Sequence, residues 1–177
     1  ALFSNVAGLA HTTGAETTFG YTSWLQNSGV SNIAVGLAQS LGDYGVLGLS
    51  VNSMNFGTID KTTVGSPEMG NNGTFKISMM NIAVSYAKAF SNTIYAGATI
   101  KIVNEGIDNV TGTGVAIDAG VKYVTGDNYE LKFGIALKNW GPSMSFSGDG
   151  LSTNALFQYS NHYQTLEQRS ASFELPS

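Results

Sequence analysis

The chain of 177 residues contains no cysteine, only three prolines and a single arginine, Arg169. The absence of cysteine excludes disulfides, thiolate metal sites and cysteine nucleophiles. Eight Lys and Arg residues with a formal net charge of -4 make no basic patch, so we expect no nucleic-acid partner. Charged residues make up 11% of the chain, against about 25% in an average soluble domain. Few side chains are therefore left to cover a surface that faces water.

Long apolar runs are also missing, which excludes a transmembrane helix. The hydrophobic share of 42% and the small net charge are those of a folded chain rather than a disordered one. The length suits one domain over residues 1–177. The first residue is Ala1 rather than Met, so we expect that the N-terminus is processed or recorded incompletely.

Apolar residues alternate with small or polar ones along most of the chain, and helical periodicity is nearly absent. No segment between the alternating stretches could form a crossover helix, so the sheet is expected to be antiparallel and the fold all-β. About seven to eight strands are predicted, at residues 30–40, 45–54, 75–90, 94–103, 114–124 and 129–138, with weaker ones at about 15–24 and 170–175.

The predicted connections alternate in length. Short turns at 41–44, 91–93 and 125–128 are followed by long loops near 55–74, 104–113 and 139–170, rich in Gly, Asn, Ser and Thr. Short turns at one end and long loops at the other are typical of a bacterial outer-membrane barrel.

A soluble β-sandwich has the same alternation, so a soluble sandwich that acts as a binding module is an alternative. Three features favour an antiparallel transmembrane β-barrel. One face of the strands carries small residues that suit a crowded lumen, and the strands are about 10 residues long, as a tilted crossing requires. Aromatic residues also gather at both strand ends, as interfacial girdles do. They are Tyr44, Phe90, Tyr95, Tyr123 and Tyr129 beside the short turns, and Trp24, Phe56, Phe75 and Trp140 towards the long loops.

Five charged residues share the inward parity of neighbouring strands. They are Lys101, Asp118, Lys122, Lys132 and Lys138. A buried single charge is costly, so these side chains are expected to pair or to contact water. They form either a salt-bridge network inside the barrel, or a polar path or docking site for a plug segment.

No pattern supports catalysis. Ser160, His162 and Glu167 are the best available hydrolase set, and they lack the context of a nucleophile elbow. Glu105 and Asp108 do not match the spaced ligands of a calcium loop. We therefore expect no enzyme, no catalytic residue, no cofactor and no metal.

Several short stretches resemble the PorV/PorQ family of outer-membrane proteins. They are Asn5-Val6-Ala7-Gly8-Leu9-Ala10, Tyr21-Thr22-Ser23-Trp24-Leu25, residues 48–57 and Leu137-Lys138-Asn139-Trp140-Gly141-Pro142. The first two lack the proline that the family has there. In order and spacing these stretches span most of residues 1–147.

The resemblance implies a barrel of the long-chain fatty-acid transporter type with more strands than this chain supplies, so we expect an N-terminal portion of a longer protein. It also implies a role in type IX secretion at the bacterial outer membrane, in contact with its lipid. PorV-like members dock on the giant translocon barrel and bind secreted cargo through its C-terminal signal domain. The alternative is uptake of hydrophobic small molecules, which would need an apolar pocket inside the barrel.

The long loops are the expected cargo-facing surface. A few apolar residues carry most of the binding energy in an interface, so the apolar loop residues are the candidate anchors. They are Phe56, Met69, Trp140, Met144, Phe146, Phe157 and Tyr159. The alternative is that they close the top of the barrel or lie at the membrane interface.

Overall fold

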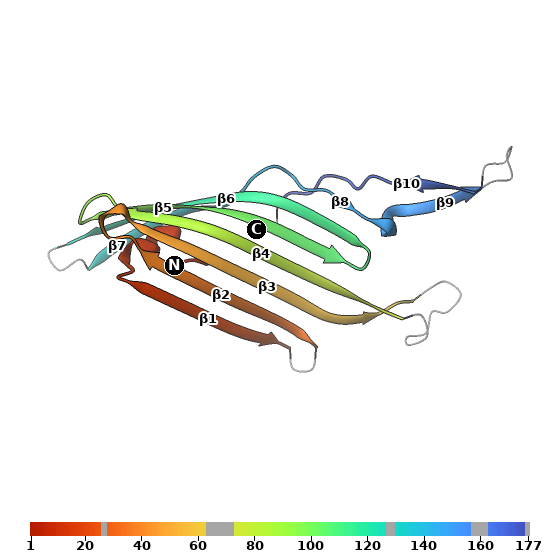
Figure 1. Cartoon of the computed structure of the whole chain (residues 1–177), viewed down its shortest axis with the longest axis horizontal. Helices are drawn as coiled ribbons and strands as arrows, with labels where there is room; N and C mark the ends of the chain where they lie inside the picture. Colours follow the sequence, from red (N-terminus) through yellow and green to blue (C-terminus); the bar gives the residue numbers. More distant parts are fainter. Residues whose placement is uncertain (26–27, 63–72, 127–129, 157–162, 176–177) are drawn as a thin grey trace.

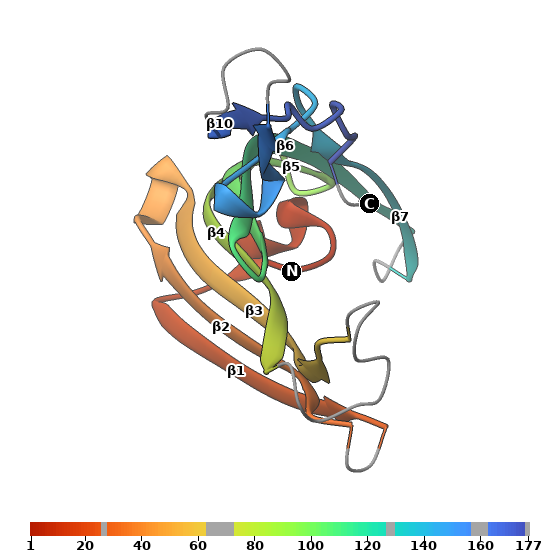
Figure 2. The same cartoon turned by 90° about the vertical axis from the view of Figure 1, so that its right-hand side faces the viewer.

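The computed structural model describes residues 1–25, 28–62, 73–126, 130–156 and 163–175, and it consists mainly of one curved antiparallel sheet (Figures 1 and 2). The sheet order follows the sequence from β1 to β7, and the short β8 pairs with β6 beyond the end of β7. Its strands are β1 (Ala15–Trp24), β2 (Val30–Ser40), β3 (Val46–Asp60), β4 (Thr74–Ala89), β5 (Ile94–Ile107), β6 (Val110–Thr125), β7 (Leu131–Trp140) and β8 (Phe146–Ser147). The predicted all-β, antiparallel architecture is confirmed.

The β2–β3, β4–β5 and β6–β7 connections lie at one end of the sheet, which we call the turn end. The β2–β3 connection contains the short 3-10 helix η2 (Gly42–Tyr44), and Ser91 stabilises the β4–β5 turn by accepting hydrogen bonds from two backbone N–H groups, those of Thr93 and Ile94. At the opposite end, which we call the loop end, the chain carries a separate hairpin of β9 (Ser152–Leu156) and β10 (Tyr163–Glu167), preceded by η3 (Asp149–Leu151). Figure 1 shows this hairpin reaching past the loop-end tips of β5 and β6.

The long loop predicted at 104–113 is wrong. β5 and β6 stay paired to Ile107 and Val110, and only a two-residue turn joins them. Asp108 adopts a left-handed conformation with φ of 52° there, which Asp tolerates better than most residues. The Gly and Thr residues that resembled a loop are small residues of a strand, and Gly112 is covered closely by Met144 and Phe146.

The other two predicted loops are shorter than expected. β3 continues through a bulge at Gly57, whose φ of 82° favours glycine and whose N–H donates to Asn55 Oδ1 at 2.8 Å. Residues 61–73 therefore make the connection in place of 55–74. Within 139–170 lie the end of β7, β8, η3 and the β9–β10 hairpin. The strand start predicted at 170–175 is one isolated bridge between Phe173 and Met144.

The two faces of the sheet differ as the alternation predicted. The concave face carries small buried side chains such as Ala83, Ser85, Ala87, Thr99 and Ala116. The convex face carries large apolar side chains that nothing in the described structure covers. These include Ile33, Leu37, Leu49, Val84, Ile100, Ile102, Val121, Phe133, Ile135 and Leu137.

The first residues of the chain return to the concave face as a plug, residues 1–12, which includes η1 (Val6–His11) (Figure 2). Val6 and Leu9 of this plug pack against Val46 and Ala87 of the sheet in a buried apolar cluster. The small concave residues leave the room that the plug occupies. A docking site for a plug segment was one of the two alternatives predicted for the inward charges. The sequence did not indicate that residues 1–12 form this plug.

Asn5 fixes the plug to the sheet. Its Oδ1 accepts the N–H of Ala7 at 3.0 Å and caps η1, while its Nδ2 donates to Val121 O at 3.2 Å and to Ile135 O at 3.3 Å. The Asn5 side chain lies directly over Gly120, where a Cβ atom would overlap its Oδ1. Glycine at 120 is therefore required by a close approach.

We predict that Gly120→Ala releases the plug while the sheet stays folded. The added methyl group displaces Asn5, and each lost hydrogen bond costs about 1 kcal/mol. Amide hydrogen exchange at residues 5–9 should accelerate about tenfold or more. Gly20→Ala is the matched control, because its Cβ would meet Ala34 at an ordinary 3.9 Å. Equal exchange at residues 5–9 in both variants would show that Asn5 does not hold the plug.

Candidate functional site

A buried ion pair lies at the centre of the concave face. Lys101 of β5 donates to Asp118 of β6, with Nζ 2.8 Å from Oδ1 and 2.9 Å from Oδ2. The two side chains are only 11% and 15% exposed. The sequence predicted that these inward charges would pair or contact water, and these two pair with each other.

The same carboxylate also shapes β7. The pairing of β6 with β7 shifts register between Ile117 and Ala119, and Asn139 adopts a left-handed φ of 57° opposite the shift. The N–H of Asn139 donates to Asp118 Oδ1 at 2.7 Å. Asp118 thus satisfies both the Lys101 ammonium and the backbone group that the bulge removes from the strand ladder.

Two further lysines of the predicted set contact the plug. Lys138 Nζ donates to the carbonyl of Phe3 at 3.0 Å, and Lys122 Nζ lies 2.9 Å from His11 Nε2. An ammonium group has no acceptor, so Lys122 donates and His11 Nε2 accepts. Four of the five predicted charges therefore divide between one ion pair and direct contacts with residues 1–12, and the fifth, Lys132, lines a pocket beside His11.

His11, at the end of the plug nearest the turn end, contacts Tyr95 as well as Lys122. Its ring stacks at a tilt on Tyr95, with centroids 4.2 Å apart. Burial, together with the positive charges of Lys122 and Lys132, lowers the pKa of His11 below its usual value of 6.5. The imidazole is therefore neutral at pH 7 and accepts the Lys122 hydrogen bond. Tyr95, one of the predicted girdle residues, lies on the concave face, where it is paired with Lys122.

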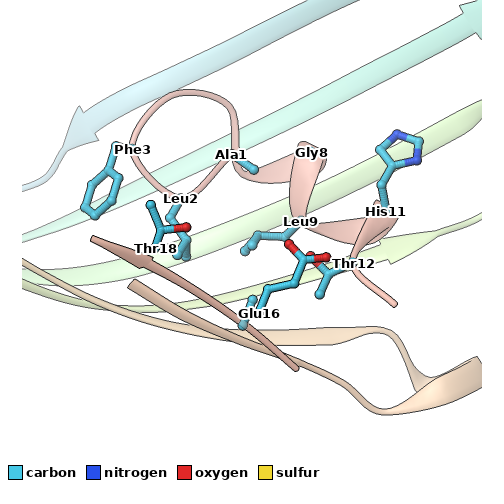
Figure 3. Close-up of a pocket in the computed structure, with 10 residues that line it drawn as sticks. Ala1, Leu2, Phe3, Gly8, Leu9, His11, Thr12, Glu16 and Thr18 are labelled. Atoms are coloured by element: carbon cyan, nitrogen blue, oxygen red, sulfur yellow. The ribbon is translucent and has the colours of Figure 1, made fainter. Parts of the chain in front are cut away.

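Two small cavities adjoin the plug. One of about 190 Å³ separates it from β1 and is lined by Leu2, Leu9, Thr12, Glu16 and other residues. In Figure 3 the Glu16 carboxylate points towards Thr12, whereas the His11 ring points away from this group. The other cavity, of about 110 Å³, lies beside the ion pair and also borders Asn52 and Asn81. Neither is the large apolar pocket that uptake of a hydrophobic compound would need.

The candidate cargo anchors do not form one patch among the described residues. Trp140 is exposed at the end of β7, and Phe56 is half-buried within β3 rather than in a loop. Met144 is buried, and Phe146 packs edge-on against Phe173 at a centroid distance of 5.8 Å. Met144 and Phe146 thus cover the loop end of β6. Met69, Phe157 and Tyr159 lie outside the described residues.

Sequence reasoning missed the plug contacts of Asn5, His11 and Phe3. The cap signal at Asn5 was present, since Asn precedes a short apolar run, but His11 resembled ordinary loop sequence. Tyr95, with its inward parity, was the available signal for a partner on the concave face.

In the described ranges, no group of three or more His, Asp or Glu side chains could hold a metal ion. The same part of the chain contains no helix long and apolar enough to cross a membrane. Ser160 and His162 of the hydrolase set lie outside the described residues, and Glu167 ends β10.

Comparison of the chain with protein-family models, with curated proteins and with solved structures found no match.

We predict that Lys101→Met lowers the free energy of unfolding by about 3 kcal/mol, because it leaves the Asp118 carboxylate buried without its partner. Denaturant titration of the chain in detergent measures this. Lys61→Met is the matched control, since Lys61 pairs with Asp108 at an exposed site and should lose less than about 1 kcal/mol. Similar losses in both variants would contradict the central role of the buried pair.

Proposed function

We propose that this chain forms part of a transmembrane β-barrel in the bacterial outer membrane, and that the barrel serves type IX protein secretion. The location in a membrane is supported by one observation, the exposed apolar side chains of the convex face. The secretion part rests on the resemblance of the motifs in residues 1–147 to the PorV/PorQ family.

The convex face needs an apolar partner. Leu49, Val84 and Ile100, which are directly paired across β3, β4 and β5, are each more than half exposed. An apolar surface of several strands is far larger than the patches that soluble monomers expose. In a soluble sandwich a second sheet would cover it, and the other sheet in the described structure is the two-stranded β9–β10. Lipid is a partner that covers a whole sheet face in outer-membrane barrels, and this supports the proposal.

The stagger of the strands also supports a barrel. Ser50, Ala83 and Ala116 lie on one row of paired residues. Measured from this row towards the turn end, β3 begins 4 residues away (46 to 50), β4 ends 6 away (83 to 89) and β6 ends 9 away (116 to 125). The turns therefore advance steadily across the sheet, so the strands are tilted relative to the line of turns. Barrel closure requires such a tilt and shear.

The strand lengths and aromatic positions agree with a membrane crossing. β3 to β6 have 14 to 16 residues, more than the roughly 9–11 that a tilted strand needs to cross the hydrocarbon core. Tyr44 and Phe90 are exposed at the turn end, and Trp24 and Trp140 are exposed at strand ends towards the loop end. Such positions suit the two membrane interfaces.

For the secretion role, the chain would dock on the giant translocon barrel and bind secreted cargo through its C-terminal signal domain. The loop end suits a protein partner, because the β9–β10 hairpin and the β5–β6 tip extend there (Figure 1). A two-stranded hairpin offers backbone edges to which a partner strand can add. Uptake of hydrophobic compounds is less well supported, since the ion pair, Lys122, Lys138 and the plug occupy the concave face.

We predict that Ile100→Arg prevents stable insertion. Ile100 lies mid-strand on the convex face and is 59% exposed, so an arginine there would meet the hydrocarbon core at a cost of about 2–4 kcal/mol. The free energy of folding into lipid vesicles measures this loss. On a face that met water, the same substitution would change stability by about 0.5 kcal/mol or less.

Tyr44→Arg is the matched control for this test, because Tyr44 is 78% exposed at the turn end. Near the interface an arginine costs about 0–1 kcal/mol. If Ile100→Arg is as well tolerated as Tyr44→Arg, or if the protein is recovered without detergent, the membrane proposal is wrong.

We predict that Phe157→Glu and Tyr159→Glu weaken cargo capture while the barrel still folds. Affinity purification of the native protein in mild detergent, with mass spectrometry of the co-purifying chains, measures this. A translocon barrel and secreted proteins with a shared C-terminal domain should be recovered with the unsubstituted chain and with Tyr44→Glu, a control at the opposite end. Unchanged cargo recovery with both loop variants would contradict the anchor assignment. Recovery of the chain alone with bound lipid would favour transport.

A further inference from the structure

A third, larger cavity lies at the turn end of the concave face, where it borders His11 of the plug; it is separate from the two cavities described above. Its volume is about 500 Å³, and we call it the turn-end pocket. Its lining residues are His11, Asn92, Tyr95, Lys122, Val124 and Lys132. They supply two ammonium groups, an imidazole, a phenol and a side-chain amide, and none of these residues is acidic.

The sheet register brings the two lysines together. Lys122 is paired directly with Tyr95 on β5, and Lys132 of β7 is paired with Val124, two residues along β6 from Lys122. The lysines are therefore diagonal neighbours on one face, a spacing that long side chains can bridge. Lys122 Nζ lies 5.9 Å from the centroid of the Tyr95 ring and donates to His11. Val124, the partner of Lys132, is buried.

We propose that the turn-end pocket binds a phosphate group, held between Lys122 and Lys132 with His11 as a third ligand. Two like charges held on the same face repel each other, and an anion between them removes that repulsion. A phosphate dianion has enough oxygens to accept from both ammonium groups and from one ring nitrogen at the same time. This site lies on the concave face and does not depend on what covers the convex face.

The charged surroundings favour an anion. Lys122 faces His11 from β6 and Lys132 faces it from β7. Glu16 of β1 and the N-terminus of Ala1 line the cavity beside β1, which His11 also borders, and the His11 ring points away from that group (Figure 3). Glu130, next to the start of β7, extends over Gly126. Residues 127–129 between them are outside the described residues. Among the described residues, the groups lining the pocket that carry or can gain a positive charge are the two ammonium groups and the His11 ring.

The pKa of His11 provides a way to detect phosphate binding at this site. Its pKa is lowered partly by the positive charges of Lys122 and Lys132, after the larger effect of burial. A phosphate bound between the lysines offsets this repulsion and accepts a hydrogen bond from the protonated ring. The pKa of His11 should therefore rise when phosphate binds.

The test uses the whole chain in detergent micelles. His162→Gln leaves His11 as the only imidazole, so its ring resonances are assigned directly. Inorganic phosphate is titrated at fixed pH and matched ionic strength, with chloride as the reference anion. We expect a saturable shift of the His11 resonances and a higher His11 pKa in phosphate than in chloride.

Lys122→Gln and Lys132→Gln should each weaken phosphate binding about tenfold, the effect of losing one charge-assisted hydrogen bond. Lys132→Gln leaves the Lys122–His11 hydrogen bond in place, so it tests the pocket without releasing the plug. Lys76→Gln, which removes the same charge near the loop end of β4, is the control and should bind phosphate as the unsubstituted chain does.

Dihexanoyl phosphatidic acid distinguishes a lipid headgroup from free phosphate as the source of the ligand. Equal affinity for both compounds assigns the site to the phosphate group alone, and at least tenfold tighter binding of the lipid assigns it to a headgroup. The proposal is overturned if neither compound gives a saturable shift, or if the shifts persist unchanged in both Lys122→Gln and Lys132→Gln. Failure of vesicle insertion by Ile100→Arg has no bearing on these shifts, so the two proposals fail separately.

Discussion

Curvature is the constraint on which the rest of this structure depends. A strongly curved sheet has less room on its concave face than on its convex face. Many concave positions are therefore small, with Ala83, Ser85, Ala87 and Gly120 among them, and most bulky apolar residues of the same strands point outwards. The small residues leave space for the plug, and the plug supplies Val6 and Leu9 as the core that the concave side chains cannot make themselves. The outward residues then need a partner of their own, which is the physical basis for placing this face in lipid.

Charge on the concave face follows from the same constraint. Water has little access to the Lys101–Asp118 pair, so the polar groups there need partners. Asp118 satisfies Lys101 and the N–H of Asn139 together, and Lys138 donates to the carbonyl of Phe3. Lys122 finds only the neutral ring of His11 and has no acid partner in the described structure. The positive charge left at the turn end is what makes that pocket suited to an anion.

The fold was largely predictable because alternation reports directly on a sheet with two different faces. The predicted strands at 15–24 and 30–40 coincide with β1 and β2. The loop predicted at 104–113 was wrong because Gly and Thr are frequent both in loops and on a crowded concave face, and composition does not separate the two. The alternation of the strands was enough to identify the inward charges. It did not identify the plug residues that contact the sheet, because the contacts of Asn5 and His11 with β6 join residues more than 100 positions apart, and no local pattern encodes such contacts.

The stretches that resemble the PorV/PorQ family have structural roles of their own. Asn5-Val6-Ala7-Gly8-Leu9-Ala10 caps and packs the plug, and Asn139 within the stretch at residues 137–142 forms the bulge that Asp118 holds. Both lie where the backbone departs from regular strand, so this geometry alone would preserve them in any barrel with a filled interior. These stretches therefore support the hypothesis of a barrel with a filled interior more directly than the hypothesis of cargo binding. The discriminating residues for secretion are those at the loop end, because only that end extends past the sheet to reach a folded partner.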